Sequence, residues 1–192
     1  MKRKPIKVGF DLDGVLLYNP ARIVRPLISL LKKKKILIDR KELEFYVPKP
    51  GPQQLMWDLF HKSSCFMAPG IDRIRLMKKE GIIEPYLITG RFGHLENDFN
   101  KWKRKMRADE LFERCYMNSA DEQPHLFKER LITELNLEIF VEDNWDIVKY
   151  LSSNKKRKII WVSNIFDWKI THPYKVSNLN QAIDRIEQIE QH

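Results

Sequence analysis

The sequence contains little cysteine and no long apolar run. Its two cysteines, Cys65 and Cys115, lie far apart without C-x-x-C spacing, so neither a disulfide framework nor a zinc site is indicated. No apolar stretch approaches the ~20 residues that a membrane-spanning helix needs, and the charged residues 1–4 are not followed by the apolar segment of a signal peptide. Internal repeats and low-complexity segments are also absent. We therefore expect a protein of a reducing compartment, the cytoplasm, with no membrane partner.

The composition is that of a basic globular chain. With 192 residues, 43% of them hydrophobic, the chain is long enough for one domain with a real core and a small insertion. The formal net charge of +9 indicates an anionic partner, either a small phosphorylated substrate such as a nucleotide or a nucleic acid. The sign of the charge does not choose between these partners, and the oligomeric state is not predicted.

Two carboxylates follow an apolar segment near the N-terminus. Residues 6–10 predict a buried strand, and Gly14 predicts a sharp turn in which the backbone can approach a ligand. Because side chains alternate along an extended chain, Asp11 and Asp13 are expected on the same side just beyond this strand. An ordinary turn or helix N-cap would show the same pair of aspartates, so the pattern needs support from further along the chain.

Beyond residue 69 the sequence alternates between short apolar strands and helices. Such an alternation predicts a Rossmann-like α/β fold with a parallel five-stranded sheet and helices on both faces. In such folds ligands bind beyond the carboxyl ends of the strands, where the strand order reverses. The predicted strands are residues 6–10, 85–88, 115–117, 138–141 and 159–162, and the predicted helices are 71–80, 95–107, 127–135, 146–151 and 179–189.

The segment after the first strand has a different character. An amphipathic helix is predicted over residues 22–31, and residues 47–52 are too rich in proline for regular structure. We interpret residues 17–68 as a small helical cap inserted after the first strand. The core would then consist of residues 1–16 and 69–192.

Polar residues suited to phosphate follow the second predicted strand and begin a later helix. The hydroxyl of Thr89, the backbone at Gly90 and the guanidinium of Arg91 are groups that hold phosphate oxygens, although Thr89-Gly90 would also suit a simple turn. Lys128 is expected at the start of a helix, where a cation is unfavourable for the helix dipole and needs another reason to be there. A solvated surface lysine is the alternative.

Adjacent acids end the fourth predicted strand. Glu142 and Asp143 come directly after it, and Asp146 lies three residues beyond Asp143. Oxygen-rich clusters of this kind suit Mg²⁺, which prefers hard ligands. A helix N-terminus would also explain Asp143 or Asn144.

The order of these elements resembles the haloacid dehalogenase superfamily of phosphohydrolases. The resemblance extends over residues 6–162, and the cap is similar to that of its deoxyribonucleotidase-like branch, as are residues 66–70 and 121–128. The four motifs of the superfamily are matched in turn by residues 11–16, by Thr89-Gly90, by Lys128, and by Glu142-Asp143.

The resemblance implies a catalytic role for four residues. Asp11 would attack phosphorus and form an aspartyl-phosphate. Asp13 would protonate the leaving alcohol and later deprotonate water. Thr89 and Lys128 would stabilise the phosphoryl charge and, with Gly90 and Arg91, would bind the phosphate.

The same resemblance implies Mg²⁺ as the cofactor. Asp11, Asp143 and the backbone carbonyl of Asp13 would hold the metal, and either Glu142 or Asp146 is open as a further ligand. Since loss of an alcohol from a phosphate ester needs an acid and loss of a halide does not, Asp13 favours a phosphatase over a dehalogenase.

The sequence is compatible with two functions. The first is a Mg²⁺-dependent phosphomonoesterase, a hydrolase acting through an aspartyl-phosphate on a nucleotide or a similar small ester, as a 5'-nucleotidase would. The alternative is a phosphatase of nucleic-acid ends, or a basic nucleic-acid-binding protein with a vestigial site that uses residues 101–107 and 155–158. Intact Asp11, Asp13, Lys128 and Asp143 favour the enzyme.

Overall fold

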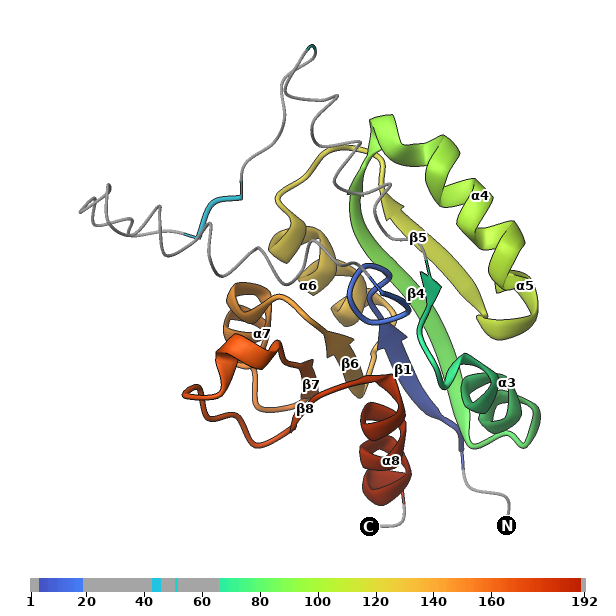
Figure 1. Cartoon of the computed structure of the whole chain (residues 1–192), viewed down its shortest axis with the longest axis vertical. Coiled ribbons are helices and arrows are strands. Elements are labelled where there is room, and N and C mark those ends of the chain that lie inside the picture. The colour runs from blue at the N-terminus through green and yellow to red at the C-terminus, as the bar shows by residue number, and fades with distance from the viewer. Residues whose placement is uncertain (1–3, 19–42, 46–50, 52–65, 191–192) are drawn as a thin grey trace.

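A computed structural model describes residues 4–18, 43–45, 51 and 66–190 (Figure 1). The helix predicted over residues 22–31 lies outside the described residues. Of the predicted cap, the structure describes residues 17–18, 43–45, 51 and 66–68.

A six-stranded parallel sheet forms the centre of the molecule, as the alternation of strands and helices predicted. The prediction of five strands missed the short edge strand β8, which at two residues is too short to show a periodicity. In spatial order the strands are β5 (Arg114–Asn118), β4 (Ile83–Phe92), β1 (Ile6–Phe10), β6 (Ile139–Glu142), β7 (Lys158–Val162) and β8 (Lys175–Val176).

The five helices predicted in the core are confirmed, with small shifts at their ends. The short helix α5 was not predicted. Arg107 adopts a left-handed conformation with φ of 53° and separates α5 from α4. Within the described ranges, no helix has the length and apolarity that crossing a membrane requires. The helices of the described residues are α3 (Ile71–Lys79), α4 (Glu96–Met106), α5 (Ala108–Leu111), α6 (Pro124–Glu134), α7 (Trp145–Leu151) and α8 (Leu179–Glu190), with 3-10 turns η2 (Gly93–Leu95) and η3 (Ile165–Asp167).

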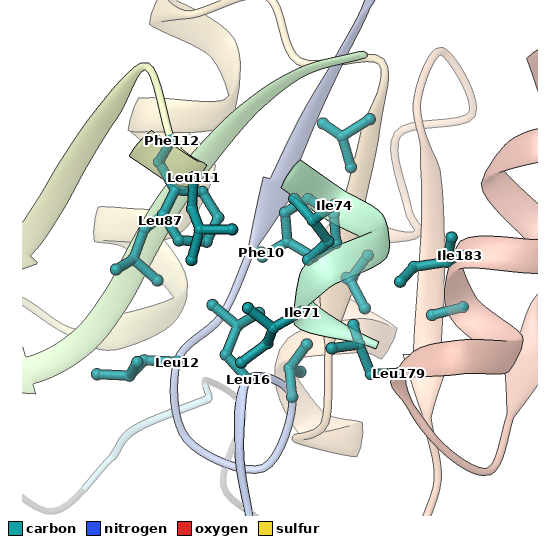
Figure 2. Close-up of a cluster of buried hydrophobic side chains, with 14 of the residues drawn as sticks. Phe10, Leu12, Leu16, Ile71, Ile74, Leu87, Leu111, Phe112, Leu179 and Ile183 are labelled. Atoms are coloured by element: carbon teal, nitrogen blue, oxygen red, sulfur yellow. The ribbon is translucent and has the colours of Figure 1, made fainter. Parts of the chain in front are cut away.

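Hydrophobic side chains pack on both faces of the sheet, as the alternation within each strand requires. On one face, Phe10 of β1 and Leu87 of β4 pack against helices α3, α5 and α8 (Figure 2). On the other face, Ile88 of β4 and Phe140 of β6 pack against α6 and α7. Gly9 lies on this second face, where a Cβ atom would stand 2.5 Å from the Phe140 ring.

The strand order reverses at β1. Strand β4 pairs with one edge of β1 and β6 with the other, although neither follows β1 directly in the chain. The loop after β1 therefore lies between two neighbouring loops at the carboxyl edge of the sheet (Figure 1). This is the place where parallel α/β sheets bind ligands.

The two ends of the predicted cap meet at the core. Strand β2 (Leu17–Tyr18) pairs antiparallel with β3 (Phe66–Met67), so that Leu17 lies opposite Met67. The chain thus leaves the core and returns to it at one paired point.

Candidate active site

Asp11 is buried directly beyond the central strand. Its backbone N–H donates to the carbonyl of Val141, which ties the start of the loop to β6. Because Phe10 points to the face covered by α3, the alternation of the strand turns Asp11 toward the face covered by α6. The Asp11 side chain is only 7% exposed. The sequence-based placement of Asp11 at the carboxyl end of β1 is therefore confirmed.

Lys128 reaches Asp11 from α6. Its Nζ lies 3.0 Å from Asp11 Oδ1 and 2.6 Å from Glu142 Oε2, and the side chain is 3% exposed. The prediction that Lys128 begins its helix was wrong, because α6 starts at Pro124 and Lys128 lies in the second turn. What requires a cation here is the pair of buried carboxylates and not the helix terminus. The alternative of a solvated surface lysine is also wrong.

Burial and charge shift the proton affinities of this group. Burial raises the pKa of Asp11 well above its ordinary value, and the neighbouring Glu142 and Asp143 raise it further, against the opposing effect of Lys128. Burial also raises the pKa of Glu142. Burial alone would lower the pKa of Lys128, but Asp11 and Glu142 outweigh it and raise that pKa. Asp11 and Glu142 therefore share one buried ammonium.

Glu142 is fully buried and hydrogen-bonded on both oxygens. Its Oε1 accepts from the backbone N–H groups of Asp143, at 3.2 Å, and Asn144, at 2.9 Å, while Oε2 accepts from Lys128. Glu142 thus shapes the turn after β6 and holds Lys128 toward Asp11. Its carboxylate also lies close enough to those of Asp11 and Asp143 to share a metal ion with them.

Asp143 approaches the turn at Gly14. Gly14 has φ of +83°, and a Cβ atom built on it would stand 2.3 Å from Asp143 Oδ2. The Trp161 indole N–H donates to the Asp143 carbonyl at 3.2 Å. The absence of a side chain at Gly14 is what allows the two loops to meet, which agrees with the sharp turn expected there.

The acids at this point fit a divalent cation. Asp11, Glu142 and Asp143 each offer a carboxylate oxygen, and these oxygens lie within 4.8 Å of one another. Lys128 balances only part of their charge, so a buried negative charge remains for a hard cation to neutralise. Asp146 is exposed in the first turn of α7 and is not among the three.

Thr89 and Gly90 lie within β4 instead of following it. The strand continues to Phe92 through a register shift relative to β5 after Thr89. Thr89 is 1% exposed, and its hydroxyl accepts from the Arg91 N–H at 3.3 Å. A Cβ atom on Gly90 would stand 3.2 Å from Pro124 Cβ, so this glycine allows α6 to approach β4.

Arg91 and Asp13 form a bidentate ion pair. Arg91 Nε lies 2.7 Å from Asp13 Oδ2, and Arg91 Nη2 lies 2.8 Å from Asp13 Oδ1. The third nitrogen, Nη1, lies 2.5 Å from Asp98 Oδ2. Sequence reasoning assigned Arg91 to phosphate and missed Asp98, because an acid in the first turn of a helix is common for the helix dipole alone.

A parallel sheet of this strand order, covered by helices on both faces and carrying an acidic cluster where the order reverses, is a haloacid dehalogenase-like α/β fold. Comparison with solved structures shows the same fold. A β-phosphoglucomutase from Clostridium difficile superposes with a TM-score of 0.60 at 17% identity, over 97% of this chain and 97% of that one.

Two further structures agree. A haloacid dehalogenase-superfamily hydrolase from Ehrlichia chaffeensis has a TM-score of 0.55 at 13% identity, over 98% of this chain and 99% of its own. CbbY from Rhodobacter sphaeroides, solved with phosphate, has a TM-score of 0.55 at 14% identity, over 90% and 94%. No family model and no curated protein matches the sequence. At these identities the likeness concerns the fold.

Proposed function

We propose that this protein is a Mg²⁺-dependent phosphomonoesterase that acts through an aspartyl-phosphate on a small phosphate ester. The observation that carries the proposal is Asp11, buried at the carboxyl end of the central strand with Lys128 at 3.0 Å and two further acids beside it. A carboxylate in that setting can act as a nucleophile toward an anionic group only if cations offset the charge. The haloacid dehalogenase-like fold supports the same reaction class.

The reaction divides into two displacements at phosphorus. A carboxylate oxygen of Asp11 forms a bond to phosphorus while the ester P–O bond breaks, and the departing oxygen takes a proton from Asp13. Water then attacks the aspartyl-phosphate and gives its proton to Asp13, which releases phosphate and restores Asp11. Throughout, the ammonium of Lys128 and the hydroxyl of Thr89 stabilise the phosphoryl oxygens.

Asp11 and Asp143 are the residues that would hold Mg²⁺, together with the backbone carbonyl of Asp13. Bound there, the cation supplies positive charge against the phosphoryl group and the acids. Glu142 is engaged by Lys128 and by two backbone N–H groups, so we assign it to positioning Lys128 and leave the metal to the other acids.

For the substrate we propose a nucleotide, as in the deoxyribonucleotidase-like branch that the sequence resembles. The formal charge of +9 supports an anionic substrate of this kind and would also suit the end of a nucleic acid. The purely nucleic-acid-binding alternative is less favoured, because a vestigial site would not retain Asp11, Lys128 and Asp143 in these contacts.

The direct test is phosphate release from a panel of ribo- and deoxynucleoside monophosphates, sugar phosphates and p-nitrophenyl phosphate. We expect turnover with Mg²⁺, none with excess chelator, and loss of at least ~10²-fold in Asp11→Asn, which cannot act as the nucleophile. The ranking of the panel tests the nucleotide proposal. Absence of turnover by folded wild-type protein on every ester would reject the small-molecule phosphatase.

Metal binding has a separate readout in thermal stability. A cation that binds only the folded state stabilises it by RT ln(1 + [L]/Kd), which is ~2.7 kcal/mol at a hundredfold excess over Kd. We expect Mg²⁺ to raise the Tm of the wild type and to have much less effect on Asp143→Asn. An equal rise in the Tm of both proteins would show that Asp143 does not hold the metal.

A further inference from the structure

All three nitrogens of the Arg91 guanidinium bind carboxylates. Nε and Nη2 bind the two oxygens of Asp13, and Nη1 binds Asp98. The Arg91 side chain is 1% exposed and that of Asp98 is 19% exposed. Each of the three guanidinium nitrogens therefore makes a charge-assisted bond to a carboxylate in a buried position.

Three separate elements bring this group together. Asp13 comes from the loop after β1, Arg91 from the shifted end of β4, and Asp98 from the first turn of α4. The extra residues that shift β4 against β5 fall between Thr89 and Phe92, so the irregularity coincides with Arg91. Such irregularities redirect side chains in sheets. The pairing of Arg91 with Asp13 thus follows from the way β4 ends.

A two-point contact controls orientation as well as charge. Two parallel N–H···O bonds fix the plane of the Asp13 carboxylate, which a lysine at the same place cannot do. The third bond, to Asp98, fixes the guanidinium in turn. In the structure both Asp13 oxygens accept bonds from Arg91, so the direction in which this carboxylate faces is set from the side of β4.

We propose that Arg91 is a positioning residue for Asp13, held in place by Asp98, and not a ligand of the phosphoryl group. The inference rests on the proposed phosphatase function. Arg91 and Asp98 orient the carboxyl group that exchanges protons with the leaving oxygen and with water. A misdirected Asp13 slows proton delivery to the leaving group while the binding of phosphate by the remaining residues persists.

A misplaced Asp13 should affect substrates according to their leaving groups. An alkoxide is a poor leaving group and needs a well-placed acid, whereas p-nitrophenolate leaves without one. Misplacing Asp13 should therefore slow the first displacement, transfer of the phosphoryl group to Asp11, far more with alkyl phosphates than with p-nitrophenyl phosphate. A residue that binds the phosphoryl group would affect both substrates alike, because they share that group.

The experiment measures kcat and KM for p-nitrophenyl phosphate and for the alkyl phosphate that the wild type hydrolyses fastest. In Arg91→Lys and Asp98→Ala we expect kcat/KM, which reports on phosphoryl transfer to Asp11 and not on the later hydrolysis of the common aspartyl-phosphate, to fall ~10- to 100-fold on the alkyl ester and less than ~3-fold on the aryl ester. Asp98→Asn, which keeps a neutral acceptor for Nη1, should recover part of the loss. Inhibition by orthophosphate should stay within ~3-fold of wild type in all three.

The matched control is Arg73→Lys. Arg73 also bridges two acids, Asp184 and Glu187, but it does so between α3 and α8 and away from the site. It should leave the ratio of the two activities unchanged. Thermal unfolding of every variant shows whether the fold is retained.

Two results would overturn the inference. Equal loss on both esters with weakened inhibition by orthophosphate would make Arg91 a phosphate ligand. Unchanged activity in Arg91→Lys would show that charge alone suffices. Absence of wild-type turnover on both esters is a different outcome, since it would reject the proposed function itself and with it this role.

Discussion

Single residues in the site are held by opposing charges. Lys128 lies between Asp11 and Glu142 with no more than 3% of its side chain exposed. Burying an ion away from water is costly, and the two carboxylates with their further hydrogen bonds offset that cost. The same contacts place an ammonium beside the proposed nucleophile, so stability and chemistry depend on one side chain.

Lys128→Met should destabilise the fold by ~3–5 kcal/mol, because it leaves two buried carboxylates without their cation. Urea unfolding without metal, at pH 7, measures the loss. The control is Arg130→Met, since Arg130 makes a similar pair of contacts with Glu122 and Glu134 but is 45% exposed. Such a surface network is worth at most ~1 kcal/mol. Similar losses in the two variants would contradict the buried contacts described for Lys128.

The Lys128→Met variant should also become less stable as the pH rises from 5 to 8. Burial raises the pKa of Asp11 and of Glu142, and loss of Lys128 removes the contact that lowers both. The folded state then binds more protons than the unfolded state, so the free energy of unfolding falls with increasing pH. Urea midpoints at several pH values test this, and a midpoint that does not fall over the same range would show that the acids are ionised in the fold.

Among the structural elements, the turn after β1 is the most constrained. Gly14 combines a positive φ with a direct approach to Asp143, and its N–H donates to the Leu17 carbonyl at 2.8 Å. The turn therefore brings the loops of β1 and β6 together. An L-residue here would meet two obstacles, the backbone conformation and the Asp143 carboxylate.

Gly14→Ala should reduce phosphatase activity by ~10²-fold, because a Cβ atom at this point displaces Asp143. Gly81→Ala provides the comparison. Gly81 has φ of +73°, and a Cβ atom added there would meet no atom of the described residues within 4 Å, so it shares the backbone strain without the contact. Gly81→Ala should lose ~1 kcal/mol of stability from the backbone conformation alone, and Gly14→Ala should lose more because of the added contact with Asp143. Only Gly14→Ala should lose activity and the Mg²⁺-induced rise in Tm. Full activity in Gly14→Ala would mean that Asp143 is not needed where the structure places it.

At the scale of the whole molecule, the inserted segment, in its described residues, meets the core at two places. The pairing of β2 with β3 brings its ends together, and the insertion also contacts the core at Phe45. The backbone N–H of Phe45 donates to Gln123 Oε1, and its ring packs against His125 of α6. We propose that residues 17–68 form a cap that is separate from the core in folding and governs the choice of ester.

Replacing residues 19–65 by Asn-Gly should leave a folded core, because this dipeptide suits a tight turn between Tyr18 and Phe66. Circular dichroism and urea unfolding should show a cooperative transition, weakened by ~1–3 kcal/mol through loss of the Phe45 side-chain contacts. Activity on p-nitrophenyl phosphate should persist while discrimination among alkyl esters is lost. A non-cooperative transition would show that the insertion is part of the core.

The sequence alone determined the α/β class and the location of the candidate site. Periodicity marked five of the six strands of the parallel sheet, and acids beyond two of them predicted where Asp11 and Asp143 lie, because parallel strands end at one edge. Lys128 was also identified, although for the wrong reason, since the start of a helix is poorly marked in a sequence and α6 begins earlier than predicted.

The tertiary structure decided which charges meet. Arg91 binds Asp13 and Asp98, and Glu142 binds Lys128 across fourteen positions of the chain, through contacts set by strand register and helix packing. No local pattern encodes such pairs, because each partner is chosen by the three-dimensional placement of its element. Thus the residue types available to the chemistry could be read from the sequence, whereas their partners, and hence their individual roles, follow from the fold.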